Sequence, residues 1–192
     1  MASKKFTVRL TGRTPLVLHN NCCVDPLHPL KKEISAITGK KKKVDADYLQ
    51  LRKLEFVAGL YHTAEMGPFV PSQNIRKMLI EAARKDKNGK QFESGIFIIE
   101  DAAIQYEGPR DIEGMLSMGD EFSWTTPCGN QQATIMRTRP RFSKWSIQFE
   151  VEIEDSIVSE DMLRTAVEKS QTQVGLCDGR AIGCGRFKAE FI

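Results

Sequence analysis

A glycine- and arginine-rich stretch near the C-terminus carries the residues best suited to binding an anion. It runs VGLCDGRAIGCGRF from residue 174 to residue 187 and contains four glycines and two arginines. Glycine adopts positive φ and lets another chain approach its backbone, and turns of this kind expose N–H groups beside the cationic side chains of Arg180 and Arg186. The stretch therefore predicts contact with an extended polyanion. A tight turn between a helix and a strand has the same composition, and the glycine spacing matches neither a Walker loop nor a dinucleotide-binding motif.

Charged residues are clustered along the chain, although the net charge of +3 is too small to indicate nucleic-acid binding by itself. The basic clusters are Lys40 to Lys43; Arg84, Lys85, Lys87 and Lys90; and Arg137, Arg139, Arg141 and Lys144. The acidic clusters are Glu150, Glu152, Glu154 and Asp155, followed by Glu160 and Asp161. This pattern predicts a protein with two differently charged faces. Four consecutive lysines are also typical of a solvated loop.

The composition is that of a soluble globular protein. With 192 residues, 41% hydrophobic and 28% charged, the chain fits a single domain spanning residues 1–192 and is neither fibrous nor disordered. No apolar run approaches the ~20 residues that cross a bilayer, and the N-terminal MASKK leads directly into a strand pattern. We expect a cytoplasmic protein with no membrane partner.

The five cysteines favour reduced thiols, because their number is odd and their spacing matches no secreted framework. Cys22, Cys23 and His28 have the chemistry of zinc ligands. However, adjacent cysteines lack the usual C-x-x-C spacing and no second ligand pair follows at a suitable distance. We expect no metal and no cofactor.

Hydrophobic periodicity predicts the elements of the first half of the chain. Apolar residues alternate over 6–11 and continue at 16–18, which indicates a half-buried strand. Residues 19–44 contain turn formers, prolines and the lysine run, so we expect a long, exposed, basic insertion. A helix is predicted over 45–61, and a second, strongly amphipathic helix is predicted to start at the N-cap Ser72.

The second half is predicted to alternate strands with helices. Strands are expected at 95–99, buried on both faces, at 103–106, and at 132–139, where Pro140 ends the strand; a short helix is expected at 111–118. Strict alternation over 145–154 predicts an amphipathic strand, followed by a helix capped by Ser159 and a final strand ending at Phe191. The order strand, helix, strand, occurring twice, predicts an α+β fold of ferredoxin-like or RRM-like type. Its antiparallel sheet would carry helices on one face and leave the other face free.

Three segments, in this order, resemble the RAMP superfamily, the modified RRM-like domains that form RNA-holding backbones and guide-processing enzymes in CRISPR systems. The first is FTVRLTG at 6–12, leading into TPL at 14–16; the second is FVPSQNIRKML at 69–79; the third is the glycine-rich stretch ending in G-x-G-R and an aromatic residue. The second segment departs from the pattern, because Ser72 and Gln73 stand where backbone subunits usually carry glycine before serine. The chain is also similar to small phage and prophage proteins of this architecture.

The resemblance implies a protein that holds single-stranded RNA or DNA through its phosphates, in a homo-oligomer or filament and in the company of CRISPR-type proteins. A helix N-terminus suits a phosphate, since its unpaired N–H groups and dipole favour an anion. The phosphate ligands implied by position are Lys40, Lys41, Lys42, Lys43, Arg76, Lys77, Gly179, Arg180, Gly183, Gly185 and Arg186. The basic insertion at 19–44 is implied to reach an adjacent copy.

Catalytic residues are less well indicated. Guide-processing relatives use a histidine near the first strand, a region that His19 occupies here, and some target-cleaving relatives use an aspartate in an early loop, where Asp25 stands. Neither residue has a partner in the sequence that marks it as a general acid or base. Three readings stay open: a strand-coating protein, a metal-independent endoribonuclease, and a phage-borne mimic of a CRISPR backbone subunit that acts through protein contacts.

Overall fold

The protein is described by a computed structural model that covers residues 3–130 and 133–192. The chain divides into two compact units. Unit 1 comprises Met1–Leu16, His62–Glu107 and Ser143–Ile192, and unit 2 comprises Val17–Tyr61 and Gly108–Phe142. In chain order, unit 2 consists of two segments inserted into unit 1.

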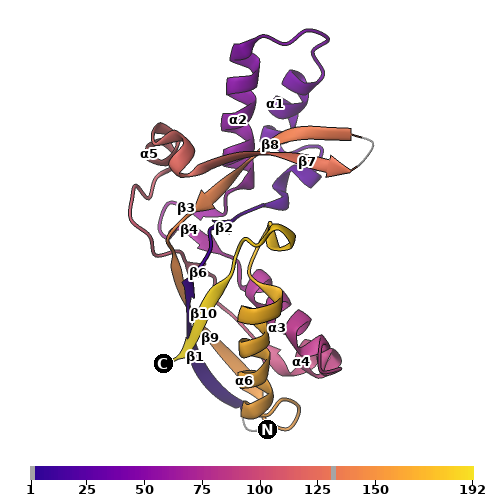
Figure 1. Ribbon diagram of the computed structural model, residues 1–192, viewed down its shortest axis with the longest axis vertical. Coiled ribbons are helices and arrows are strands. Elements are labelled where there is room, and N and C mark those ends of the chain that lie inside the picture. The colour runs from indigo at the N-terminus through magenta and orange to yellow at the C-terminus, as the bar shows by residue number, and fades with distance from the viewer. Residues whose placement is uncertain (1–2, 131–132) are drawn as a thin grey trace. The chain divides into compact units, whose positions relative to one another are not determined.

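Unit 1 contains a four-stranded antiparallel sheet with the strand order β10-β1-β9-β5. The strands are β1 Ser3–Gly12, β5 Ile96–Phe97, β9 Ser146–Glu154 and β10 Phe187–Phe191. Helix α3, Ser72–Arg84, lies between β1 and β5 in the chain, and α6, Glu160–Lys169, lies between β9 and β10; the two helices contact each other on one side of the sheet (Figure 1). This β-α-β-β-α-β order is that of a ferredoxin-like fold, which confirms the predicted fold class.

Smaller elements complete unit 1. A second antiparallel sheet has the order β3-β4-β6, with β3 His62–Thr63, β4 Gly67–Val70 and β6 Ala102–Ala103. Helix α4, Gly89–Gly95, follows α3, a π-helical turn η3, Ser170–Val174, follows α6, and a 3-10 turn η4, Arg180–Ile182, lies within the glycine-rich stretch. Helix α4 was not predicted from the sequence.

The core of unit 1 follows the predicted periodicity. On β9 the buried side chains are Ile147, Phe149, Val151 and Ile153, and the alternating polar residues face away from the core. Helix α3 buries residues at helical spacing, including Ile75 and Leu79. Each such side chain contributes ~1.5–3 kcal/mol when it leaves water. The alternation therefore sets which face of the sheet carries the helices.

The start of α3 differs from the prediction. Pro71 is the N-cap residue and Ser72 is the first helical residue. The backbone N–H of Ser72 donates to the Asp101 carboxylate at 2.8 Å. A side chain distant in sequence thus satisfies an N–H group that we had expected to be capped locally.

Unit 2 combines helices with a sheet of order β2-β8-β7, in which β7 and β8 pair antiparallel and β2 lies where the chain passes from unit 1 into unit 2. Its helices are α1 Pro29–Thr38, α2 Asp45–Gly59 and α5 Ile112–Ser117, and its 3-10 turns are η1 Asn21–Val24 and η2 Gly119–Glu121. The sheet comprises β2 Leu16–Val17, β7 Ser123–Asn130 and β8 Ala133–Phe142. Helix α2 packs against both α1 and β8 (Figure 1). Strand β7 was not predicted.

Three local predictions are corrected by the structure. The 19–44 segment is not a loop throughout, since it contains η1 and α1; Pro29, read as a break, occupies the first turn of a helix, where a missing N–H costs nothing. Pro140 does not end its strand, because β8 continues to Phe142 and the Pro140 carbonyl accepts from the Leu18 N–H at 3.0 Å. Strand β5 is not buried on both faces, since Phe97 is 50% exposed.

Candidate nucleic-acid interface

The glycine-rich stretch is held against the turn that follows β1. Thr14 Oγ1 donates to the Gly183 carbonyl at 2.9 Å and accepts from the Arg186 N–H at 2.9 Å. The Gly185 N–H donates to the Pro15 carbonyl at 2.8 Å. Two segments that lie at opposite ends of the sequence therefore form one surface of unit 1.

Gly185 and Gly183 both have positive φ, but an added side chain would meet different surroundings at the two positions. Gly185 has a φ of 68°, and a Cβ there would lie 2.0 Å from the Leu176 carbonyl oxygen, so close packing excludes any side chain. Gly183 has a φ of 89°, but a Cβ there would meet nothing within 4 Å. The backbone at Gly183 is thus open to an approaching molecule.

Some of the predicted cationic ligands bind other parts of unit 1. Arg180 forms an ion pair with Glu81 on α3. Arg76 donates to the Ile96 carbonyl at 3.3 Å and also to the Glu93 carbonyl. Their guanidinium groups therefore connect the glycine-rich stretch and α4 to α3.

Beside Thr14, a groove of about 1150 Å³ is lined by Arg13, Arg186, Lys188, Gln171 and Glu190 among others. The Arg186 Nη1 atom is buried and has no hydrogen-bond partner among the described residues. Arg13 is exposed, and its backbone N–H donates to the Arg186 carbonyl at 2.7 Å. Sequence reasoning missed Arg13, although it lies directly between Gly12 and Thr14 in the first segment of the RAMP resemblance.

The helix-free face of the main sheet has a mixed charge. Lys5 and Glu150 form an ion pair at 2.8 Å, and Arg9 donates to the Gln148 side chain at 3.2 Å. Such exposed pairs neutralise each other locally and contribute little to stability. This face presents no uniformly cationic surface.

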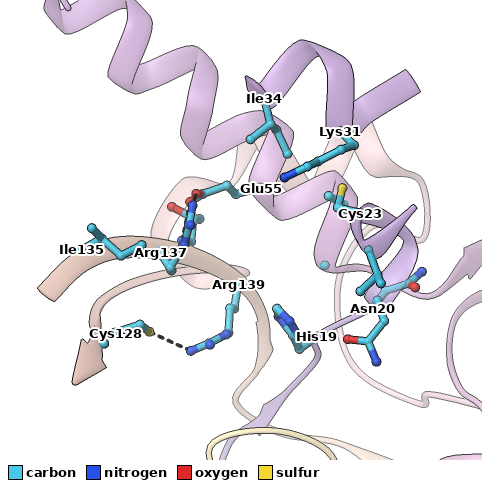
Figure 2. Close-up of a pocket in the computed structure, with 16 residues that line it drawn as sticks. His19, Asn20, Cys23, Lys31, Ile34, Glu55, Cys128, Ile135, Arg137 and Arg139 are labelled. Carbon is cyan, nitrogen blue, oxygen red and sulfur yellow. Dashed lines mark hydrogen bonds and ion pairs between the residues drawn. The ribbon is translucent and has the colours of Figure 1, made fainter. Parts of the chain in front are cut away.

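A pocket of about 510 Å³ in unit 2 brings together residues from distant parts of the sequence (Figure 2). Arg137 and Arg139 project from β8, and Glu55 comes from α2 (Figure 2). Arg139 Nη1 lies 3.0 Å from the Cys128 sulfur, and His19 lines the same pocket. The arginine cluster recognised in the sequence thus lies beside the first catalytic candidate.

The two catalytic candidates do not form a pair. Both side chains are exposed, and Asp25 Oδ1 accepts from the Leu27 N–H at 2.8 Å. Within residues 3–130 and 133–192, no hydrogen bond joins the His19 and Asp25 side chains. Tyr61 donates to the His19 carbonyl at 3.1 Å.

The four lysines between α1 and α2 have different surroundings. Lys40 is paired with Asp47 at 2.5 Å, and this hydrogen bond lowers the pKa of the Asp47 carboxyl from its ordinary value. Lys43 donates to the Lys40 carbonyl at 2.9 Å. Lys41 and Lys42 are exposed, as is Lys77 on α3. These three retain cationic groups directed to solvent.

The glycine-rich stretch also contains a thiol. Desolvation raises the pKa of Cys177 to about 12, so this thiol is neutral near pH 7. The charge of the stretch therefore comes from its arginines and from Asp178.

Among the described residues, none of the helices has the length and apolar character needed to cross a bilayer. No protein-family model matches the chain, and no curated protein matches it.

Solved structures do show a similar fold. One is a chain in the cryo-EM structure of the type III-B Cmr-beta bound to cognate target RNA, with a TM-score of 0.55 and 13% sequence identity. The similarity covers 99% of this protein but only 61% of that chain. At this identity the likeness supports the fold alone.

Proposed function

We propose that the protein binds single-stranded nucleic acid, RNA in the first place, through backbone phosphates in the groove beside Arg13 and Arg186. The observation that carries this proposal is the buried Arg186 Nη1 atom, which has no hydrogen-bond partner among the described residues in a groove that Arg13 also lines. A cationic donor without a partner is costly, and a phosphate oxygen in the groove removes that cost once the Arg186 guanidinium turns toward it.

The groove is a better site than the helix-free face of the sheet. Ion pairs such as that of Lys5 with Glu150 already occupy the cations of that face, and its further carboxylates repel a polyanion. In the groove, Arg13 and Arg186 outnumber the single carboxylate of Glu190, which Lys188 pairs at 2.7 Å. Open backbone at Gly183, near the Thr14 hydroxyl, leaves room for a strand.

RNA is the preferred ligand because the structural neighbour belongs to an assembly bound to target RNA. The same likeness favours CRISPR-type protein partners, and the RAMP resemblance implies a homo-oligomer along the strand. Lys77 of unit 1, and separately Lys41 and Lys42 of unit 2, would add phosphate contacts of their own. Arg76 and Arg180 would position the groove through Glu93 and Glu81.

The test is fluorescence anisotropy with a labelled single-stranded RNA of mixed sequence, repeated with DNA of the same sequence. Arg13→Ala and Arg186→Gln should each weaken binding by about tenfold, and each should reduce the slope of log K against log salt by about 0.7. Lys5→Ala is the matched control, because Lys5 lies on β1, the strand that precedes Arg13, but pairs with Glu150 on β9 at 2.8 Å, away from the residues that line the groove.

Unchanged affinity in the two groove variants would refute the site. A loss in Lys5→Ala as large as in Arg13→Ala would instead favour the sheet face. Shortening of the RNA during the experiment, abolished by His19→Ala, would favour the endoribonuclease alternative. Failure of the wild type to bind any strand would favour a role through protein contacts alone.

A further inference from the structure

Three metal-binding side chains meet where the 19–44 segment begins. The sulfur atoms of Cys22 and Cys23 and an imidazole nitrogen of His28 lie within 4.8 Å of one another. The two sulfur atoms are 3.9 Å apart. Tetrahedral zinc with Zn–S bonds of about 2.3 Å requires a sulfur–sulfur distance of about 3.8 Å. The thiol pair already has the spacing of two ligands on one zinc ion.

The imidazole of His28 gives an independent indication. Its Nδ1 atom is buried and has no hydrogen-bond partner among the residues that the structure describes. Buried polar nitrogens are almost always hydrogen-bonded or bound to a metal, because an unsatisfied one costs ~1–3 kcal/mol. A cation bound to this nitrogen would satisfy it.

The local backbone explains how adjacent cysteines can serve together. They lie in the 3-10 turn η1, and the Asn20 side chain caps this turn by accepting from the Cys22 N–H at 3.0 Å. The chain then turns through Asp25, whose carbonyl accepts from the His28 N–H at 3.3 Å, so that His28 returns at the start of α1. Two adjacent cysteines can therefore share a metal ion with His28, because the turn between them and α1 brings the imidazole back to the sulfur atoms.

The surroundings favour a cation. Cys22 Sγ lies 3.3 Å from the Ala58 carbonyl in the last turn of α2, and helix C-termini carry partial negative charge. Every one of these residues belongs to unit 2.

We propose that Cys22, Cys23 and His28 bind one Zn²⁺ ion as two thiolates and a neutral imidazole, with water as the fourth ligand. Binding releases the two thiol protons to solvent, including the one that Cys22 now donates to the Ala58 carbonyl. The ion joins η1 to the start of α1. It thereby fixes the first part of the basic segment, independently of any contact with nucleic acid.

The experiment uses the full-length protein, purified in reductant, stripped with a chelator and titrated with Co²⁺ and then with Zn²⁺. One equivalent of Co²⁺ should produce visible ligand-field bands of tetrahedral cobalt and a sulfur-to-cobalt charge-transfer band, and one equivalent of Zn²⁺ should abolish both. Native mass spectrometry should find one Zn²⁺ per chain. Cys22→Ser, Cys23→Ser and His28→Gln should each lower zinc affinity at least about tenfold.

Cys128→Ser is the matched control, since Cys128 is a thiol of the same unit that contacts Arg139 rather than this cluster. It should bind zinc as the wild type does. A wild type that binds less than one equivalent would overturn the proposal, as would a loss in Cys128→Ser equal to that in Cys22→Ser. No metal uptake after reduction, together with peptide mapping that finds Cys22 and Cys23 joined in a disulfide without reductant, would overturn it too.

A second measurement covers variants that fold poorly. Zinc should raise the thermal midpoint of the wild type, because a ligand that binds only the folded state stabilises it. The chelator should reverse this rise, and a midpoint that does not respond to zinc would contradict the site.

Discussion

Both oxygens of the buried Glu55 carboxylate on α2 are bound by consecutive residues of β8. Arg137 Nη1 donates to Oε1 at 2.5 Å, and the Thr138 N–H donates to Oε2 at 2.8 Å. The Glu55 side chain is 8% exposed, whereas that of Arg137 is 40% exposed, so water screens only one side of this ion pair. The pair joins helix and sheet within unit 2.

Glu55→Gln should destabilise unit 2 by about 2 kcal/mol, because a neutral amide weakens both charge-assisted hydrogen bonds. The chain has two tryptophans, Trp124 in unit 2 and Trp145 in unit 1, so urea unfolding can be followed separately in Trp145→Phe and Trp124→Phe backgrounds. The exposed Arg52→Ala on the same helix is the control. Equal midpoints for Glu55→Gln and Arg52→Ala would show that the pair contributes nothing.

Gly185→Ala should be far more destabilising than Gly183→Ala. Both residues have positive φ, so both substitutions incur a similar backbone strain of about 1 kcal/mol. Only at position 185 does the new Cβ also overlap the Leu176 carbonyl. Denaturation monitored by Trp145 fluorescence compares the stabilities of the two variants. Similar stabilities would mean that the Leu176 carbonyl does not lie against position 185.

Gly183→Ala then becomes a probe of the groove. The variant should fold, since its Cβ enters open space, but a strand passing over this backbone would meet the methyl group. We expect a several-fold loss of RNA affinity in the anisotropy assay. Wild-type affinity in a folded Gly183→Ala would show that the strand does not pass over Gly183.

Lys41→Gln combined with Lys42→Gln should reduce the salt dependence of RNA binding without affecting stability. Both side chains are exposed, and two lost phosphate contacts lower the slope of log K against log salt by about 1.4. Lys40 is left intact because it holds Asp47. Arg52→Gln with Lys53→Gln removes the same charge from α2 as a control, and an equal change there would indicate a general charge effect.

Cys177 should react slowly with iodoacetamide at pH 8. With a pKa of about 12, only about one thiol in ten thousand is ionised at that pH. The rate of alkylation should rise about tenfold per pH unit. Denaturation should restore ordinary reactivity, because it exposes the thiol to water. Peptide mapping by mass spectrometry measures the labelling of Cys177. Rapid labelling in the folded protein would contradict the raised pKa of this thiol.

The ferredoxin-like frame was predictable because its signals are local. Alternation along β9 and helical spacing along α3 each follow from which side chains leave water, and the order of these elements then limits the topology. The N-cap Ser159 was also predictable, because its hydroxyl accepts from the Met162 N–H three residues later, at 3.3 Å.

The missed features depend on residues distant in sequence. The cap of α3 comes from Asp101, and Arg180 is held by Glu81, 99 residues away. Cys22, Cys23 and His28 meet because of a turn whose geometry their spacing does not reveal. Arg13 was overlooked because only the fold brings it beside Arg186.

In the first inserted segment, Val17–Tyr61, Asn20 near the start binds two residues near the end. The Asn20 N–H donates to the Gly59 carbonyl at 3.0 Å, and its amide side chain donates to the Leu60 carbonyl at 3.1 Å. The two ends of this segment therefore lie close together within unit 2. In evolutionary terms the two inserted segments are expected to change together, because α2 of the first packs on β8 of the second and Glu55 is bound there.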